Sequence, residues 1–302
     1  MTTIWRLHIK PEAEKGIDPR QLCLTRGILG IGWPTKSSVH ATWRDYCEEA
    51  KQQYAEGIVG WRKAANAIGD HMKPGDLCWT RDRSNTYYLG RVTSDWRYEG
   101  GEEYRKADVV NVRNCDWHEA GLVDSIPGKV IASFRVSAAL QAVRDTTVLW
   151  YSMGFYNSKS SGFKYEVDMP SSLDIFSMLQ AEDLEDIVGL YLQSLGYRLI
   201  PSSCRSDTMQ YEFVMKRPGD GRMCVAQVKS GGVDIDVSEY EKHDADVFLF
   251  TSGGKYLNSP RPNVTCLQSE LIRIFLHNNL EVMPDRIRRM VSTCRAMKGK
   301  NI

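Results

Sequence analysis

All eight tryptophans of this 302-residue chain lie at or before Trp150, and none follows it. Tryptophan is a large aromatic residue that fills cores and recurs at binding surfaces, so this division indicates two domains with different roles. The length also fits two domains of about 150 residues each. We place the first domain at residues 1–150, a linker rich in Ser, Gly and Lys at 151–175, and the second domain at 176–302.

Composition excludes several classes of protein. The chain is 42% apolar and 25% charged, as globular proteins are. It has no apolar run of the roughly 18 residues that a membrane span needs, and its first residues lack the pattern of a secretion signal. Its eight cysteines form no CxxC pair, which predicts free thiols in a reducing cytoplasm. A net charge of +1 means that a nucleic-acid surface must be a local patch.

The first half mixes short strands with one long helical stretch, which predicts an α+β domain. The stretch is helical over residues 42–67, with an interruption near 57–60. MKPGD at 72–76 predicts a turn, because Pro fixes φ, Gly allows a positive φ and Asp can close the turn. The predicted strands are residues 4–9, 27–33, 77–80, 87–93 and 129–134.

The second half predicts an α/β domain with a mixed sheet flanked by helices. Residues 181–195 have a helical apolar face that ends at Gly196. DVFLFT, at the end of the third strand, is continuously apolar, as a strand buried on both faces is. The strands are predicted at 210–216, 223–229 and 245–251, and two closing helices at 271–280 and 285–297.

Glu212 and Lys229 lie in two predicted strands that the turn PGDGR joins. If the strands pair, an acid and a lysine meet near one end of the sheet. A carboxylate with a backbone carbonyl can bind Mg²⁺, and a lysine can stabilise charge on a phosphate. The same pattern is also typical of a surface ion pair, and the residues alone leave both interpretations open.

Four segments of the second half resemble the nuclease core of the Mrr-type branch of the PD-(D/E)XK superfamily: GYRLIP, SDTMQYEFV, CVAQVKSG and DADVFLFTSGG. The resemblance covers residues 180–256. Its Gln–x–Lys motif matches Gln227, Val228 and Lys229, its upstream acid matches Glu212, and its helix glutamate matches Glu185.

This resemblance implies a restriction-endonuclease-like fold that cleaves double-stranded DNA with Mg²⁺, or Mn²⁺ in its place. The implied catalytic residues are Glu212, Gln227, Lys229 and Glu185, and the implied metal ligands are Glu212, Glu185 and the backbone carbonyl of Val228. Two features depart from the family pattern. Glu212 stands where Asp is usual, and the glycines expected before it are missing around Asp207.

The first half resembles the EVE-like members of the PUA superfamily over residues 4–135. The resemblance is carried by WRLHIKP, GIGWP, HMKPGDLCWTRD and YYLGRV. It implies a small β-barrel that holds a modified base in an aromatic pocket. The implied pocket walls are Trp33 and Trp79, with Trp96 or Tyr88 as a third. Arg81 and Arg83 are the implied phosphate contacts, and Asp76 is expected to close its turn.

Tryptophans also build cores, and this interpretation stays open for each of the three. Together the two resemblances imply a type IV restriction enzyme of a prokaryotic cytoplasm, which flips a modified cytosine into an aromatic cage and cleaves DNA nearby. We expect a homodimer during double-strand cleavage. Two alternatives remain: a non-catalytic reader of modified DNA or RNA with a degenerate nuclease fold, and a nuclease whose first half binds a partner protein.

Overall fold

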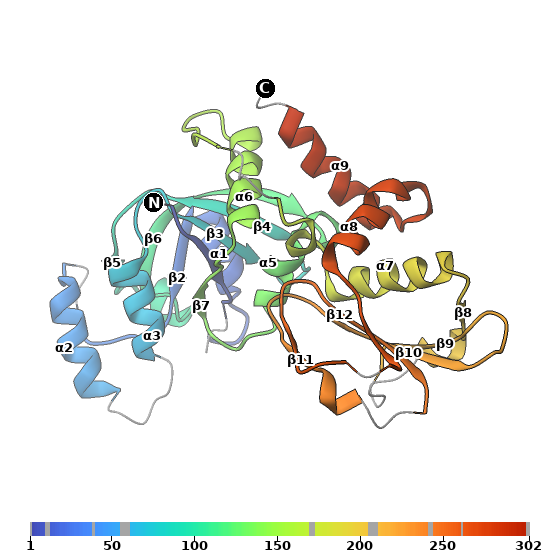
Figure 1. Cartoon of the computed structure of the whole chain (residues 1–302). Coiled ribbons are helices and arrows are strands. Elements are labelled where there is room, and N and C mark those ends of the chain that lie inside the picture. The colour runs from blue at the N-terminus through green and yellow to red at the C-terminus, as the bar shows by residue number, and fades with distance from the viewer. Residues whose placement is uncertain are drawn as a thin grey trace. The chain divides into compact units, whose positions relative to one another are not determined.

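The computed structural model describes residues 2–9, 13–37, 40–54, 61–168, 173–204, 211–240, 244–260 and 262–299. The chain divides into two compact units, each with its own sheet (Figure 1). The first unit comprises Met1–Ile126, Val130–Leu173 and Met297–Ile302, and the second comprises Pro127–Lys129 and Asp174–Ala296. The first is α+β and the second combines a mixed sheet with helices, which confirms the predicted fold class at this coarse level.

The first unit contains a curled, half-barrel sheet with the strand order β2-β6-β4-β3-β1-β7, and β5 pairs with β6. The pair of β1 and β3 is parallel, and the other pairs are antiparallel. The long strand β6 pairs with β4 at one end and with β2 and β5 at the other, so one strand links the two parts of the curl. The strands are β1 (Ile4–Leu7), β2 (Ile28–Ile31), β3 (Leu77–Arg81), β4 (Tyr87–Val92), β5 (Arg97–Tyr98), β6 (Asn111–Gly121) and β7 (Leu140–Ala142).

The one helical stretch that the sequence predicts in the first half is helical in its described part, and further helices form around it. The stretch 42–67 forms α2 and α3, and α3 continues into a π-helical turn; residues 55–60, which include the predicted interruption, lie outside the described residues. The helical elements are α1 (Pro19–Thr25), α2 (Trp43–Gln53), α3 (Trp61–Asn66), η1 (Ala67–His71), α4 (Glu102–Lys106), η2 (Val123–Ser125), α5 (Gly128–Ser133) and α6 (Thr146–Lys159).

Two expectations are corrected here. The strand predicted at 129–134 is wrong, because these residues form α5. Val130 and Phe134 are both buried and lie four residues apart, a helical spacing that the short apolar run concealed. The predicted linker at 151–175 is helical in its first part, because α6 continues to Lys159.

The MKPGD turn forms as predicted. Gly75 has a φ of +93°, which glycine adopts without strain. Asp76 is buried, and its Oδ2 accepts hydrogen bonds from the Lys73 backbone N–H at 3.0 Å and from Trp5 Nε1 at 2.8 Å. The prediction that Asp76 closes the turn is therefore confirmed, and its carboxylate also joins the turn to β1.

The second unit contains a mixed five-stranded sheet with the order β14-β12-β10-β9-β8, and a separate pair of β11 and β13. β10 is antiparallel to β9 and parallel to β12. The predicted hairpin is thus confirmed, and β10 has the predicted bounds. The strands are β8 (Arg198–Leu199), β9 (Phe213–Lys216), β10 (Met223–Lys229), β11 (Ile235–Asp236), β12 (Asp246–Thr251), β13 (Tyr256–Leu257) and β14 (Val264–Cys266).

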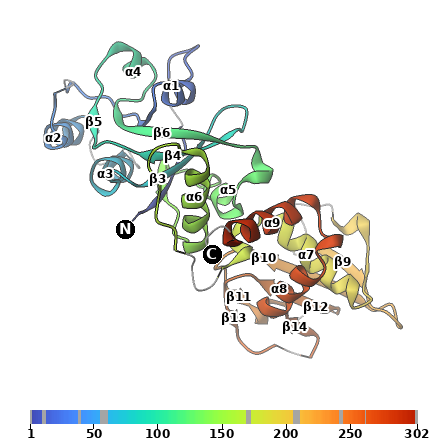
Figure 2. The ribbon, with the colours of Figure 1, turned by 90° about the horizontal axis from the view of Figure 1, so that it is seen from above.

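Helix α7 packs on this sheet and lies beside α8 (Figure 2). Its face of Leu184, Ile187 and Leu192 is fully buried, and the helix stops at Gly196, whose φ is +93°. Both features confirm the sequence prediction. The helical elements of this part of the chain are η3 (Ile175–Met178), α7 (Ala181–Ser194), η4 (Pro201–Cys204), η5 (Val237–Tyr240), α8 (Ser269–Asn278), η6 (Leu280–Val282) and α9 (Asp285–Gly299).

The helices of the described ranges are all too short or too polar to cross a membrane. The seven cysteines whose side chains are described have free thiols, as the sequence predicts.

Candidate functional site

The β9–β10 hairpin of the second unit brings Glu212 and Gln227 together. The Glu212 backbone N–H donates to the carbonyl of Ala226 at 3.0 Å, so Glu212 stands beside β10 one residue before β9 begins. Gln227 Nε2 donates to Glu212 Oε1 at 2.6 Å. Lys229 lies two residues beyond Gln227 on the same strand and therefore on the same face of the sheet. The predicted hairpin therefore brings the Glu212 carboxylate against Gln227, with Lys229 farther along the same face of β10.

Helix α7 contributes Glu185 to this group. The pKa of Glu185 is raised to about 7, first by burial and then by the nearby carboxylate of Glu212, while Lys229 opposes the rise. These electrostatic effects mean that Glu185 lies near both residues of the hairpin. All four predicted catalytic residues thus form one group, which we call the hairpin cluster: Glu185, Glu212, Gln227 and Lys229.

The oxygen atoms of the hairpin cluster are of the kind that Mg²⁺ prefers. Glu212 and Glu185 are carboxylates, and the Val228 carbonyl lies 3.4 Å from Gln227 Nε2. Burial is the first cause of the raised pKa of Glu185 and the Glu212 carboxylate the second, so a cation bound here would favour the ionised form of Glu185. Within the described ranges no three or more His, Cys, Asp or Glu side chains gather as a metal site, so a metal at this place would depend on the backbone oxygen as well.

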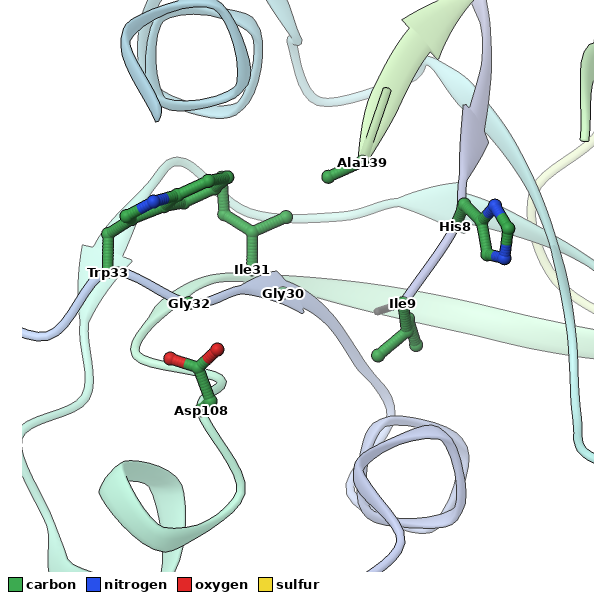
Figure 3. A pocket seen from close by; sticks show the side chains of 8 residues that line it. All are labelled: His8, Ile9, Gly30, Ile31, Gly32, Trp33, Asp108 and Ala139. Carbon is green, nitrogen blue, oxygen red and sulfur yellow. The ribbon is translucent and has the colours of Figure 1, made fainter. Parts of the chain in front are cut away.

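The first unit has a small cavity at the end of β2 (Figure 3). Its volume is about 50 Å³, and it combines apolar side chains with the indole of Trp33 and the carboxylate of Asp108. Trp33 is the one predicted base-binding residue that lines it. We call this the Trp33 cavity, and its lining residues are His8, Ile9, Gly30, Ile31, Gly32, Trp33, Asp108 and Ala139.

Two lining residues have left-handed backbones. Trp33 has a φ of +65° and Asp108 a φ of +51°. A positive φ is tolerated by Asp but is rare for a bulky residue such as Trp, and a strained residue of this kind costs about 1–3 kcal/mol. The surrounding structure must therefore hold Trp33 in place.

Two side chains donate hydrogen bonds to the backbone carbonyls of the strained Trp33 and of the residue before it. Asn111 Nδ2 donates to the Gly32 carbonyl at 2.7 Å, and Tyr46 Oη donates to the Trp33 carbonyl at 3.2 Å. Asn111 is fully buried, and its own Oδ1 accepts from Trp96 Nε1 at 3.1 Å. Trp96 thus supports the loop from behind, a role different from the predicted pocket wall.

The other predicted pocket walls lie elsewhere in the first unit. Trp79 is fully buried, and its Nε1 donates to Ser152 Oγ at 3.0 Å. The structure places Trp79 in the core and not along the Trp33 cavity, because an indole with no exposed surface offers no face to a ligand. Tyr88 lies on β4, where its hydroxyl donates to Asp82 Oδ2 at 3.4 Å, and it also lies outside the lining.

The two predicted phosphate contacts, Arg81 and Arg83, lie near a third arginine. Arg20 has a lowered pKa, first because of burial and then because of the positive charges of Arg81 and Arg83. Arg83 forms an ion pair with Asp18 at 3.1 Å, and Arg81 lies 5.0 Å from the ring centre of Phe134. Arg20 is about 60 residues away in the sequence, so no local pattern indicates that it joins them.

A second cavity, of about 360 Å³, is lined by Lys15, Arg20 and Arg83 together with Glu14 and Asp18. Ile9 lines both this cavity and the Trp33 cavity, so a surface of mixed charge, with three basic and two acidic side chains, adjoins the aromatic one. A ligand with a planar group and a phosphate could therefore contact both.

The sequence analysis missed Asp108 and His8 as well as Arg20. Asp108 lies 75 residues from Trp33, and only the strand pairing of β2 with β6 brings the two regions together. The signal in the sequence is Gly32, because a glycine can mark a close approach to the backbone. In the structure a Cβ built at this glycine would lie 2.3 Å from Asp108 Oδ1.

A family profile described as "Domain of unknown function (DUF8426)" matches residues 5–133. The matched segment contains every lining residue of the Trp33 cavity except Ala139, and it ends before the hairpin cluster. No curated protein and no solved structure matches this chain.

Proposed function

We propose that this protein is a modification-dependent DNA endonuclease, in which the first unit holds a modified cytosine and the second hydrolyses a phosphodiester bond. The observation that carries the proposal is the hairpin cluster, where Glu212 contacts Gln227 at 2.6 Å and both Glu185 and Lys229 lie close by. Gln227, Val228 and Lys229 match the Mrr-type motif, and Glu212 stands at the position of its usual Asp. We propose an EVE-like fold for the first unit and a restriction-endonuclease-like fold for the second.

The chemistry follows from the charges of the cluster. Glu212, Glu185 and the Val228 carbonyl are the residues that would hold Mg²⁺, which when bound polarises the phosphate and activates water. Lys229 places a positive charge where the phosphate oxygens gain negative charge. Before a metal binds, the pKa of Glu185 is about 7, and bound Mg²⁺ would favour its ionised form.

Recognition is assigned to the first unit. Flipping a base costs a few kcal/mol of unstacking, and stacking on an aromatic side chain returns about 1–3 kcal/mol per base. Trp33 supplies the aromatic surface, and the adjoining arginines supply charge for the flanking phosphates. Cleavage of both strands requires two nuclease units, so the proposal includes a homodimer on DNA.

Phage DNA provides the test. Preparations with unmodified, methylated, hydroxymethylated or glucosylated cytosine are incubated with the protein and Mg²⁺, and again with Mn²⁺. Lys229→Ala is compared with Lys216→Ala, which removes an exposed lysine from the neighbouring strand. We expect one modified DNA to be cut by the wild type and by Lys216→Ala but not by Lys229→Ala. Equal cutting of all four preparations would exclude recognition of a modified base by the first unit. The first unit would then be tested for a protein partner.

One observation favours a second function, a reader of modified DNA or RNA without nuclease activity. Gln227 Nε2 faces both the Glu212 carboxylate and the Val228 carbonyl, so an amide N–H₂ occupies the space between two of the oxygens that would hold the metal. This alternative predicts selective binding with no cleavage, and no rise of the unfolding temperature when Mg²⁺ or Mn²⁺ is added. A metal-dependent rise that Glu212→Gln removes would exclude it.

A further inference from the structure

The strand that carries Lys229 ends at that residue, beside the end of its parallel neighbour. β10 and β12 pair in register as far as Lys229 and Thr251, which are the last residues of the two strands. Each strand then continues into the same three residues, Ser-Gly-Gly, at 230–232 and at 252–254. We call these segments the first and the second SGG loop. Because the regular pairing stops at Lys229, the position of this lysine depends on how the two loops contact each other.

Ser252 connects the two loops directly after the last paired residues. Its backbone N–H donates to the Lys229 carbonyl at 3.1 Å, which continues the hydrogen-bond pattern of the parallel ladder. In a regular ladder the Gly231 N–H would next donate to the Ser252 carbonyl, but here it donates to Ser252 Oγ at 2.8 Å. The hydroxyl thus takes the place of a ladder carbonyl where the chain turns away, with a φ of +71° at Gly231.

The contact of the two SGG loops is close and enclosed. Ser252 is buried, and a Cβ built at Gly253 would lie 3.3 Å from the carbonyl oxygen of Gly231. Farther along the first loop, Thr251 Oγ1 donates to the Val233 carbonyl at 2.8 Å. Two side chains of the second loop region therefore fix the chain that follows β10, and the Ser252 hydroxyl acts closer to the strand end.

Lys229 is the member of the hairpin cluster with the least support from its own strand. Gln227 lies two residues inside β10 and contacts Glu212 at 2.6 Å, whereas Lys229 is the last residue of the strand. The lysine is half-buried, and its charge acts on the carboxyl group of Glu185. A long side chain at a strand end can reach a fixed point only if the backbone beneath it is held.

We propose that Ser252 is a positioning residue for Lys229: its backbone N–H and its hydroxyl hold the chain at the strand end, so that the lysine ammonium is presented to the phosphate that is cleaved. The inference rests on the nuclease half of the proposed function. Ser252 acts through Lys229 and touches none of the reacting atoms. Its loss should still slow cleavage, because a displacement of about 1 Å at a reacting group can lower a rate by up to about 100-fold.

Ser252→Ala removes the hydroxyl and keeps the backbone hydrogen bond. Single-turnover cleavage is measured at saturating protein with Mg²⁺ on the phage DNA that the wild type cuts, and affinity for the same DNA is measured in EDTA. We expect the rate to fall by about tenfold and the affinity to stay unchanged. Ser252→Thr keeps a hydroxyl and should restore the rate to within about threefold of the wild type. Ser230→Ala, which changes the exposed serine of the first SGG loop, is the matched control.

Urea unfolding separates positioning from a general loss of structure. The unfolding midpoint of Ser252→Ala should stay close to that of the wild type, since Gly231 is exposed and water can replace the hydroxyl as its acceptor. A slower rate at an unchanged midpoint, together with recovery in Ser252→Thr, is therefore the result expected of a positioning residue.

NMR spectra of the lysine test the same link without DNA. The lysine amines of the full chain are reductively methylated with carbon-13, and the Lys229 signal is identified by its absence from Lys229→Arg. We expect Ser252→Ala to shift and narrow this signal, because the side chain gains freedom. Ser252→Thr and Ser230→Ala should leave it in place, and the signal of Lys216, an exposed lysine of β9, should not change in any variant.

A cleavage rate of Ser252→Ala within about twofold of the wild type, or a Lys229 signal that this variant leaves unchanged, would overturn the inference. The two measurements also separate it from the proposed function. If the wild type cuts no DNA with Mg²⁺ or Mn²⁺, the proposed nuclease fails, and the NMR spectra still decide whether Ser252 holds Lys229.

Discussion

The two candidate sites are built from different kinds of backbone. The hairpin cluster stands on regular elements, with Gln227 and Lys229 on one strand, Glu212 at the start of its partner and Glu185 on a helix. The Trp33 cavity stands on loop segments beyond strand ends, with two residues of positive φ and a network of buried side chains that hold them. Regular elements place side chains by their period, whereas loops place them only through long-range contacts.

This difference also separates the expected effects of mutation. A side chain on a paired strand can be changed while the backbone hydrogen bonds keep their register, so its loss should affect chemistry more than folding. A side chain that holds a strained loop contributes to stability and to the site at once. The predictions below test this contrast, beginning with the largest expected effect.

Glu212→Gln should lower the rate of DNA cleavage by about 100-fold or more, because it removes a carboxylate from the hairpin cluster; 100-fold corresponds to about 2.7 kcal/mol. The affinity for modified DNA in EDTA should stay unchanged. Glu239→Gln, which changes an exposed acid of the same unit, serves as the control for both measurements. Equal cleavage by the Glu212→Gln variant and the wild type would remove the hairpin cluster from the reaction.

Trp33→Ala should weaken binding of modified DNA by about 10- to 100-fold, which is the range for loss of one aromatic stacking partner. Trp33→Gly should bind as weakly but unfold at higher denaturant concentration than Trp33→Ala, because glycine adopts a φ of +65° without strain. Phe163→Ala, at an aromatic that is 47% exposed and outside the cavity, is the control. Unchanged binding by the Trp33 variants would show that the modified base does not bind at the Trp33 cavity.

Asn111→Ala should lower the free energy of unfolding by about 1–3 kcal/mol, since it leaves the Gly32 carbonyl and Trp96 Nε1 without their partner. It should also weaken binding of modified DNA, because the Trp33 loop loses one of its supports. Asn114→Ala, on the same strand but exposed, should do neither. Urea unfolding and DNA binding measure the two effects, and a variant that loses stability but binds normally would separate the loop support from recognition.

The pKa of Glu185 predicts how stability depends on pH. Its carboxyl has a pKa of about 7 in the folded protein against 4.5 ordinarily, so the folded state holds the proton more tightly than the unfolded state. The protonated Glu185 therefore adds to the free energy of unfolding. This addition is complete below pH 4.5 and is lost as the pH rises to 7. One pKa unit is about 1.4 kcal/mol, so the loss is at most about 3 kcal/mol before solvent screening.

Glu185→Gln should remove this slope and be more stable than the wild type at about pH 8, as measured by denaturation at several pH values from about 4.5 to 8. Mg²⁺ should reduce the fall of the wild type's free energy of unfolding with rising pH, because a bound cation favours the ionised carboxylate. An unchanged slope in the variant would place the pH dependence on another group.

Arg83→Ala should have the smallest effect. The side chain is 66% exposed and already pairs with Asp18, so its loss should reduce the slope of log affinity against log salt by about 1 or less, equally for modified and unmodified DNA. Arg44→Ala removes an exposed arginine from α2 and should leave the slope unchanged. If Arg83→Ala alters the preference for modified DNA, the arginine touches the base region and not only phosphates.

The sequence alone determined most of the second unit. The apolar face of α7, the continuous apolar strand DVFLFT and the PGDGR turn gave the order of the elements, and a period of two placed Gln227 and Lys229 on one face. Strand pairing then required Glu212 to lie beside Gln227. In the first unit the same reasoning found the MKPGD turn with Asp76, but it assigned α5 to a strand, because a six-residue apolar run carries no clear period.

The tertiary structure decided which of the tryptophans line a cavity. Trp33 and Trp79 have similar surroundings in the sequence, each close to glycine, proline and polar residues, yet one lines a cavity and the other is fully buried. That outcome depends on α6 covering Trp79 through Ser152 and on Asn111 and Tyr46 holding the loop of Trp33. Local sequence determines which way a chain turns and which face is apolar, whereas the burial of a given side chain depends on contacts with residues 13 to 79 positions away.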